Sequence, residues 1–181
     1  MLVVLVGCGG QSGDQQQTEQ QTEETTDDGV RTIRMIGIDA LKFGVESNAE
    51  GITVGENIGK NNDLLRLETI TVEPGEEITI ELYTRSNLPA SAMAHNWVLL
   101  ALDADVEAFA NAAIQAKEND YIPQDMTDQV IAQTGLAAGD QTETITFTAP
   151  EEPGTYEYIC TFPGHYASGM KGEFIVKEPE S

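Results

Sequence analysis

Three side chains that can bind a metal follow one another at equal spacing near the C-terminus. Cys160, His165 and Met170 lie five residues apart in the segment CTFPGHYASGM. The chain contains only two histidines, and the other one, His95, opens the apolar run HNWVLL far upstream. Thiolate and thioether are soft ligands and imidazole is borderline, so this set suits copper that cycles between its +1 and +2 states. We therefore interpret these four side chains as a candidate copper site.

Each of these residues also has an ordinary structural interpretation. A single histidine is usually not a ligand, and buried Cys and Met residues usually act as core hydrophobes. Here both histidines and the only cysteine outside the N-terminal segment fall at ligand-like positions, which favours a metal. A Cys–His hydrolase is disfavoured, because no nucleophile elbow or helix N-terminus is recognisable at Cys160. A copper-delivery protein with the same ligands remains an alternative, and it would require an exposed site with exchangeable ligands.

The composition argues against one class of partner. The 181 residues include 31 acidic and 9 basic side chains, for a net charge of −22. Six of the acidic residues lie within residues 9–29, which leaves −16 for residues 30–181. Nucleic acid would be repelled by such a surface. The charge fits either adaptation to high salt or attraction to a basic partner.

The N-terminal segment predicts a membrane anchor followed by a tether. The apolar run MLVVLVGC, residues 1–8, ends in small residues and Cys8, and it resembles the lipobox of bacterial lipoproteins, in which the cysteine is acylated. Residues 9–29 contain no apolar side chain and predict a disordered acidic tether. No other segment approaches the ~20 apolar residues of a membrane span. We expect acylated Cys8 to hold a soluble domain, residues 30–181, in the periplasm or another extracytoplasmic space.

Residues 30–181 have the pattern of a β-protein. Apolar and polar residues alternate in short runs separated by turn residues, at 32–38, 69–72, 78–82, 142–148 and 173–177. The Pro-Gly turn at 73–76 predicts a β-hairpin between the second and third of these runs. Residues 96–102, NWVLLAL, are more continuously apolar, as in a strand buried on both faces. Residues 103–119 instead repeat apolar residues at three- and four-residue steps, which predicts an inserted helix with Asp103 or Asp105 as its N-cap. The expected fold is an all-β antiparallel sandwich or barrel.

Two segments resemble a known family. MAHNWVL (93–99) and CTFPGHYASGMKG (160–172) are similar to the two copper-site segments of the azurin and auracyanin group of cupredoxins, the type 1 blue copper proteins. The Cys-x4-His step is azurin-like, and the His-x4-Met step resembles auracyanins. This resemblance implies a Greek-key β-sandwich with a helical insertion around 103–119 and one type 1 copper. It also implies His95, Cys160 and His165 as strong ligands, with Met170 as the axial ligand.

The resemblance further implies roles for residues beside the ligands. Asn96 would tie the two ligand loops together, with Thr161 beside the cysteine. Backbone N–H groups of Asn96 and Phe162 would point at the cysteine sulfur and raise the reduction potential. Ala94 stands where azurins usually have a glycine whose carbonyl lies near the metal. Because the ligands leave no open position for a substrate, the implied function is a blue-copper electron carrier and not an enzyme.

Apolar residues near His165 predict a docking patch for redox partners. Its expected members surround a partly exposed imidazole and are Leu41, Leu88, Pro89, Met93, Phe162, Pro163, Gly164 and Tyr166. A modest apolar patch suits brief and weak docking. The resemblance implies partners such as c-type cytochromes, quinol-oxidising complexes, a terminal oxidase or a photosynthetic reaction centre, reached by a protein held on the membrane through its lipid anchor.

Overall fold

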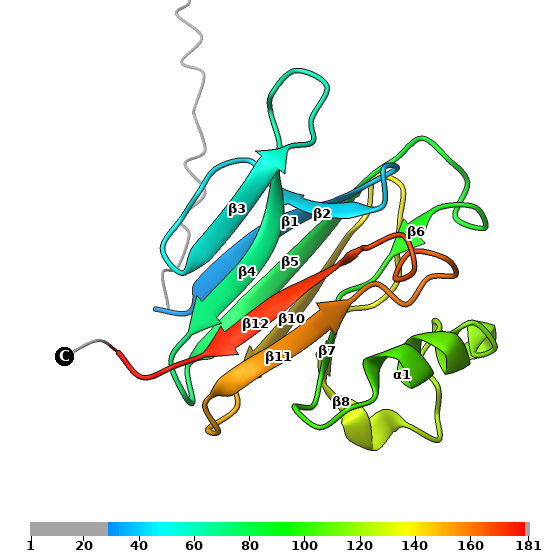
Figure 1. Cartoon of the computed structure of the whole chain (residues 1–181). Helices are drawn as coiled ribbons and strands as arrows, with labels where there is room; N and C mark the ends of the chain where they lie inside the picture. Colours follow the sequence, from blue (N-terminus) through cyan, green and yellow to red (C-terminus); the bar gives the residue numbers. More distant parts are fainter. Residues whose placement is uncertain (1–28, 180–181) are drawn as a thin grey trace, which may run out of the picture.

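The computed structural model describes residues 29–179, so Cys8 and nearly all of the predicted tether lie outside the described residues. Within this range β-strands dominate (Figure 1). The strands are β1 (Arg31–Ile38), β2 (Lys42–Val45), β3 (Ile52–Asn57), β4 (Leu65–Val72), β5 (Glu77–Arg85), β6 (Ala94–His95), β7 (Val98–Leu100), β8 (Val130–Gln133), β9 (Ala137–Ala138), β10 (Thr142–Thr148), β11 (Gly154–Ile159) and β12 (Lys171–Val176). The helical elements are α1 (Val106–Ala113) and two short 3-10 turns, Lys117–Asn119 and Thr127–Gln129.

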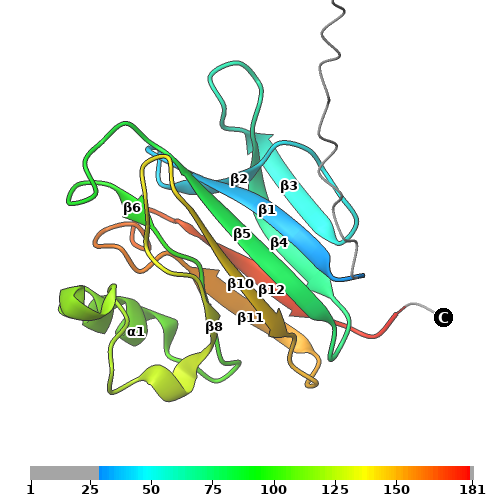
Figure 2. The same cartoon turned by 180° about the vertical axis from the view of Figure 1, so that it is seen from behind.

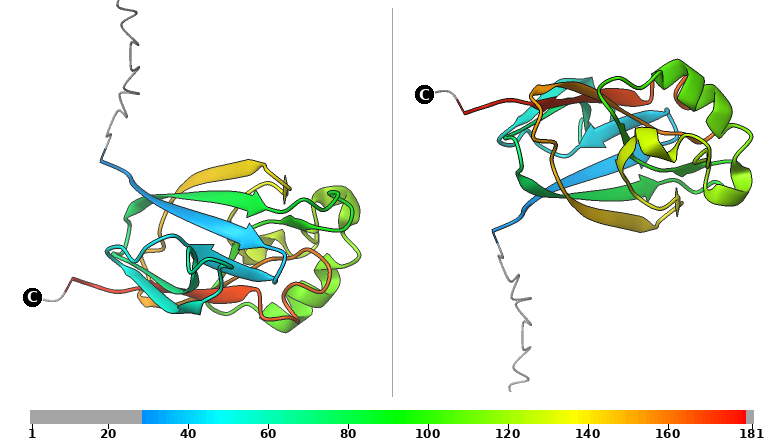
Figure 3. Two further views of the ribbon diagram at one scale, coloured as in Figure 1. Left: turned by 90° about the horizontal axis from the view of Figure 1, so that it is seen from above. Right: turned by 90° about the horizontal axis from the view of Figure 1, so that it is seen from below.

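Most strands belong to one sheet that folds over on itself. Its order is β10-β5-β1-β2-β4-β12-β11-β7-β8, and β3 also pairs with β4. Because β2 pairs with both β1 and β4, it joins two layers that face each other (Figure 3). The two ends of the sheet, β8 and β10, approach each other, so the sandwich is a nearly closed barrel. β6 and β9 form a small separate pair. The predicted all-β sandwich with one short helix is confirmed.

Two expectations about strand pairing are wrong. The turn at 73–76 forms, with the Glu76 N–H donating to the Glu73 carbonyl at 3.2 Å, but the strands on either side of it do not pair. β4 pairs with β2, β3 and β12, whereas β5 pairs with β1 and β10. In addition, β1/β5 and β4/β12 are parallel pairs. Alternation tells which side chains are buried but not which strand lies alongside, and this turn carries the chain from one layer to the other.

The core fills the space between the two layers. Ile78, Ile80 and Leu82 of β5 are fully buried and face side chains of the opposite layer. Trp97 is also fully buried, and its ring centroid lies 5.7 Å from that of Tyr158. Burial of one apolar side chain of this size stabilises the fold by about 1.5–3 kcal/mol. The segments that leave this core at one end of the barrel are therefore held on a rigid base.

The helix lies against one layer near β6 and the β11–β12 loop (Figure 2). It is shorter than the predicted range of 103–119 and begins after Asp105, whose carboxylate accepts a hydrogen bond from the Ala108 N–H at 3.0 Å. Its buried residues are Phe109, Ala110 and Ala113, and the first two pack with Val98 and other apolar residues of a second small core. The described helices are all too short to cross a bilayer.

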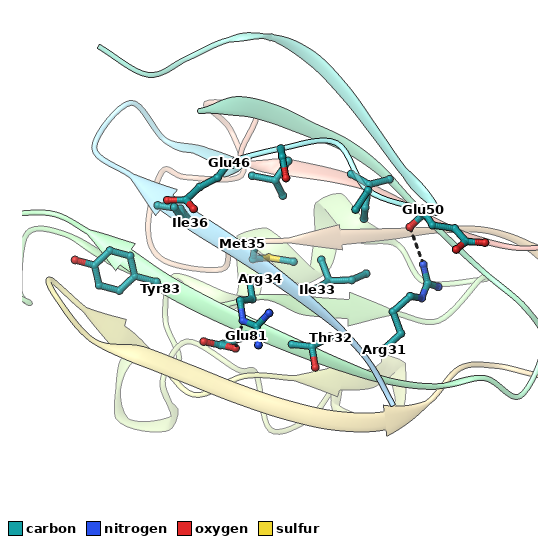
Figure 4. A pocket seen from close by; sticks show the side chains of 14 residues that line it. Arg31, Thr32, Ile33, Arg34, Met35, Ile36, Glu46, Glu50, Glu81 and Tyr83 are labelled. Carbon is teal, nitrogen blue, oxygen red and sulfur yellow. Dashed lines mark hydrogen bonds and ion pairs between the residues drawn. The ribbon is translucent and has the colours of Figure 1, made fainter. Parts of the chain in front are cut away.

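A groove runs along β1 (Figure 4). β2 pairs only with Ile36–Ile38 of β1, so the edge of the preceding residues faces no strand in the described part of the chain. Arg31 spans the end of this opening and donates to the Glu50 carbonyl at 3.1 Å and to the Glu76 carboxylate at 2.7 Å. None of the four candidate ligands lines the groove.

Candidate metal centre

The four predicted ligands come from two places in the fold that meet at one end of the barrel. His95 ends β6, while the others lie on the loop between β11 and β12 (Figure 1). Because β11 and β12 are antiparallel neighbours, this loop must leave and return at the same edge. The Cys160 N–H donates to the Met170 carbonyl at 3.1 Å, and the Met170 N–H donates to the His165 carbonyl at 3.0 Å. These bonds close the loop and place its three ligands together.

The donor atoms of His95, Cys160 and His165 converge on one point. The two Nδ1 atoms are 3.2 Å apart, and the Cys160 Sγ lies 3.4 Å from Nδ1 of His165 and 3.9 Å from Nδ1 of His95. One ligand atom from each residue lies within 4.8 Å of the others. Met170 is fully buried, and its backbone is hydrogen-bonded to Cys160 and His165. His165 is only 3% exposed, so the expected partly exposed imidazole is almost covered.

Burial shifts the pKa values of these groups towards their neutral forms. Burial lowers the pKa of His95 to about 3, and the nearby His165 contributes to this shift. Burial likewise lowers the pKa of His165 to about 4. Burial raises the pKa of the Cys160 thiol to about 12, although the backbone N–H groups of Asn96 and Phe162, directed at the sulfur, lower it. Near neutral pH both imidazoles therefore have a free lone pair, and Cys160 loses its proton when a metal binds.

The arrangement fits a single metal ion. Atoms bound at about 2.0–2.3 Å to one ion lie within about 4.6 Å of one another, which is close to the spacing of the three donors. Two imidazoles, one thiolate and one thioether form the donor set of blue-copper sites. No carboxylate belongs to the cluster, so hard ions such as Ca²⁺ or Mg²⁺ are poorly suited to it.

Asn96 links the two segments that bring the ligands. Its side-chain carbonyl accepts from the Thr161 N–H at 2.8 Å, and its Nδ2 donates to the Thr161 Oγ1 at 2.7 Å. The same Nδ2 also donates to the backbone carbonyl of Asp120 at 3.2 Å. Both Asn96 and Thr161 are buried, so loss of either partner would leave unpaired polar atoms in the interior.

The surroundings of His95 include a residue that sequence reasoning missed. A Cβ atom at Gly37 would lie 2.5 Å from Cδ2 of His95, so only glycine lets the imidazole pack on the backbone of β1. The signal was present in the sequence, since a glycine inside an alternating strand indicates close approach of another group. Ala94, before the ligand, is buried and pairs with Ala138 of β9. Nε2 of His95 is buried without a hydrogen-bond partner in the described structure.

A lysine on the other side of the loop was also missed. Lys42 of β2 donates its Nζ hydrogen to the Ser168 carbonyl at 2.6 Å, which ties the loop to the barrel. No sequence pattern indicated this contact, because 126 positions separate the two residues.

The residues predicted for the docking patch differ in exposure. Leu88 is 45% exposed, and Pro89 and Gly164 are also exposed. Leu41, Pro163 and Tyr166 are half-buried. Met93 and Phe162 are each only 7% exposed, so they lie beneath the surface and contribute little area to it.

Known proteins are similar to this chain in sequence and in fold. Residues 54–177 match the family of copper binding proteins described as plastocyanin/azurin. Auracyanin-A of Chloroflexus aurantiacus is 39% identical over 109 residues, 59% of this chain, and the match spans 63% of auracyanin-A, less than two thirds of its length. Azurin of Pseudomonas aeruginosa is 34% identical over 124 residues, 65% of this chain and 82% of that azurin. The solved structure of auracyanin A, described as a "blue" copper protein, has a TM-score of 0.60 at 32% identity and covers 81% of this chain and 98% of that one.

The fold and the buried donor set together define a copper protein of the cupredoxin type. The chain belongs to the plastocyanin/azurin family, and its similarity to auracyanins and azurins confirms the resemblance seen in the two ligand segments. It has one type 1 copper site, formed by the two histidines, Cys160 and Met170. The predicted cofactor is therefore confirmed.

Proposed function

We propose that this chain is a blue-copper electron carrier that exchanges single electrons with redox proteins and catalyses no reaction of its own. One observation carries the proposal: two imidazole Nδ1 atoms and the Cys160 Sγ converge at a site whose residues are at most 3% exposed. A closed site of this kind excludes a substrate while it still lies near the surface.

The chain's own residues keep this site dry and rigid. When bound, copper supplies a one-electron couple between its +1 and +2 states. Short hydrogen bonds between Asn96 and Thr161 hold the two ligand segments in one arrangement. The backbone N–H groups directed at the sulfur of Cys160 stabilise its negative charge. A site that changes little between oxidation states needs little reorganisation.

The surface around His165 supports docking to a redox partner. We propose that the contact surface consists of Leu41, Leu88, Pro89, Pro163, Gly164 and Tyr166, with Met93 and Phe162 supporting it from below. Such a small apolar surface favours weak and transient complexes. Partners of the kinds expected from the resemblance, such as c-type cytochromes or membrane redox complexes, fit this mode of contact.

A copper titration tests the carrier function. In the full chain with Cys8→Ser, which leaves Cys160 as the only thiol, one equivalent of Cu(II) should produce an intense blue absorption that bleaches on reduction and returns on oxidation. The matched variant that also carries Cys160→Ser should stay colourless. A protein that remains colourless would contradict the carrier proposal. Rapid loss of copper to a chelator would also contradict it and would favour copper delivery.

We also propose that Cys8 is acylated and that residues 9–29 tether the domain outside the cytoplasmic membrane. The support is the apolar run that ends at Cys8 and the acidic, wholly polar segment that follows it. After expression of the full chain in a bacterium, the protein should sediment with membranes and carry the mass of a lipid, and Cys8→Ser should release it. Membrane association that persists unchanged in Cys8→Ser would overturn the anchor.

A further inference from the structure

Two consecutive residues beside the copper site have an unusual backbone conformation. Asp120 and Tyr121, which follow the 3-10 turn Lys117–Asn119, have φ values of 51° and 62°. The left-handed region is unfavourable for a residue with a side chain, and for an aromatic residue more than for aspartate. Such a conformation persists only where neighbouring contacts enforce it, and it occurs most often at functional sites. The contacts of these two residues must therefore hold them in this conformation.

Asp120 contacts the copper site through its backbone. Its carbonyl accepts a hydrogen bond from Nδ2 of Asn96 at 3.2 Å. Asn96 is fully buried and uses its remaining bonds on Thr161, the residue after the cysteine ligand. The left-handed turn thus presents a carbonyl to an amide hydrogen that would otherwise be buried without a partner.

Tyr121 contacts the same site through its ring. Its centroid lies 5.2 Å from that of Phe162, with the planes 66° apart, which is an edge-to-face contact. The ring of Phe162 in turn lies 4.8 Å from that of His165. Tyr121 is 8% exposed, so the row of three rings is shielded from water. The backbone of Tyr121 is held independently, because its N–H donates to the Ala116 carbonyl at 3.0 Å.

We propose that the Asp120–Tyr121 turn is a positioning clamp for the copper site. Asp120 contacts the Asn96 side chain, and Tyr121 contacts the Phe162 ring. Asn96 and Phe162 are the two residues whose backbone N–H groups point at the Cys160 sulfur. The clamp belongs to the inserted segment after α1, which contributes no ligand and lies beside the β11–β12 loop (Figures 1 and 3). This inference rests on the copper site and is independent of the redox partners proposed above.

The clamp has consequences both without and with the metal. In the copper-free protein, a loose Phe162 lets the loop open and exposes the buried Cys160. Loss of an edge-to-face contact changes such an opening equilibrium about two- to tenfold. In the copper protein, poorer alignment of the N–H groups with the sulfur lowers the reduction potential.

Substitutions at Tyr121 test the clamp in the full chain carrying Cys8→Ser. Tyr121→Asn removes the ring, and asparagine tolerates positive φ, so the turn itself is retained. Tyr121→Phe keeps the ring and is the conservative control. We expect Tyr121→Asn to raise the alkylation rate of Cys160 in the copper-free protein about two- to tenfold and to lower the reduction potential of the copper protein. In Tyr121→Phe, the alkylation rate and the reduction potential should both equal those of the parent chain.

A second control separates positioning from a general loss of stability. Tyr156 is also a buried tyrosine of the main core, but its hydroxyl donates to the carbonyl of Glu152, which lies before β11 and not in the ligand loop. Tyr156→Leu should lower the free energy of unfolding without changing the potential. If Tyr121→Asn leaves the alkylation rate and the potential unchanged, or if Tyr156→Leu alters both to the same extent, the clamp is refuted. If Tyr121→Asn does not fold, Tyr121→Leu is judged by the same two measurements.

Failure of the clamp and failure of the carrier function give different results. The alkylation rate is measured without copper, so it tests the clamp even if the protein proves to be a copper-delivery protein. A blue protein with an unchanged potential in Tyr121→Asn would reject the clamp and leave the carrier function intact.

Discussion

At the scale of single residues, the site depends on keeping polar donors buried and neutral. His95, Cys160 and His165 are held within hydrogen-bonding distance of one another in the interior, with pKa values shifted by burial. A buried charge would be costly, so the copper-free protein keeps these groups uncharged near neutral pH. The same condition suits metal binding, because an imidazole must be deprotonated to be a ligand.

The stability of the copper-free protein should fall as the pH is lowered from 6.5 to 5. In the unfolded chain the imidazoles titrate near 6.5, whereas in the folded chain they titrate at about 3 and about 4. Within this window the unfolded state binds more protons, so the free energy of unfolding decreases with falling pH, by up to about 1.4 kcal/mol per pH unit for each histidine. Above about pH 7.5 the unfolded imidazoles are also neutral, and these two groups contribute almost no slope.

Urea unfolding of the copper-free Cys8→Ser chain at several pH values measures this slope. In His165→Gln, which retains only one histidine, the slope between pH 5 and 6.5 should be about half as steep. A stability that is the same at pH 5 and at pH 7 would show that the histidines are not buried in their neutral form.

At the scale of elements, the β-barrel supplies the base and the inserted segment supplies a cover. The antiparallel pair β11/β12 fixes the two ends of the ligand loop, and the small β6/β9 pair fixes His95. Phe109 and Ala110 of α1 pack in a small apolar cluster that is separate from the main core, whereas Tyr121, after α1, belongs to the main core. Loss of stability within α1 should therefore have little effect on the geometry of the ligands.

Removal of the N-cap of α1 should separate stability from copper chemistry. Asp105→Ala deletes the acceptor for the Ala108 N–H and should lower the free energy of unfolding by about 1 kcal/mol. The blue absorption should not change, because α1 holds no ligand. Asp103→Ala, two residues earlier and exposed, is the matched control and should leave both quantities nearly unchanged. A changed blue band in Asp105→Ala would show that the helix is coupled to the metal.

At the scale of the whole molecule, the dominant feature is a net charge of −22. The ion pairs of the described residues are mostly on the surface, for example Arg34 with Glu81 at 3.1 Å, and such pairs contribute little to stability. The excess of acid instead creates a field that acts on charged molecules approaching the protein.

Salt should therefore change the rates of electron exchange in opposite directions for reagents of opposite charge. Oxidation of the reduced copper protein by a small anionic complex such as ferricyanide should accelerate as ionic strength rises, because salt screens the repulsion. Oxidation by a small cationic complex should slow over the same range. Stopped-flow rates measured between about 10 and 300 mM salt test this prediction. Equal salt effects for both reagents would mean that the acidic surface lies too far from the site of exchange to matter.

Several features of the fold and of the metal site could be predicted from the sequence alone. The donor types and their five-residue spacing indicated copper, and the alternation of Thr142–Thr148 predicted the bounds of β10. The helical period after Leu102 predicted an inserted helix, although α1 proved shorter. These features are local: the side-chain chemistry, the period and the cap of a segment are properties of its own residues.

Only the tertiary structure showed which strands are neighbours and which distant residues are in contact. Alternation favoured a hairpin at 73–76, yet β4 and β5 belong to different layers, because the pattern of buried faces does not specify a neighbour. The packing of Gly37 on His95, the Lys42 bond to Ser168 and the Asp120–Tyr121 turn join residues far apart in the chain. Such contacts are set when all elements pack at once into one dense core. The sequence therefore determined which metal the protein binds, and the fold determined how firmly its ligands are held.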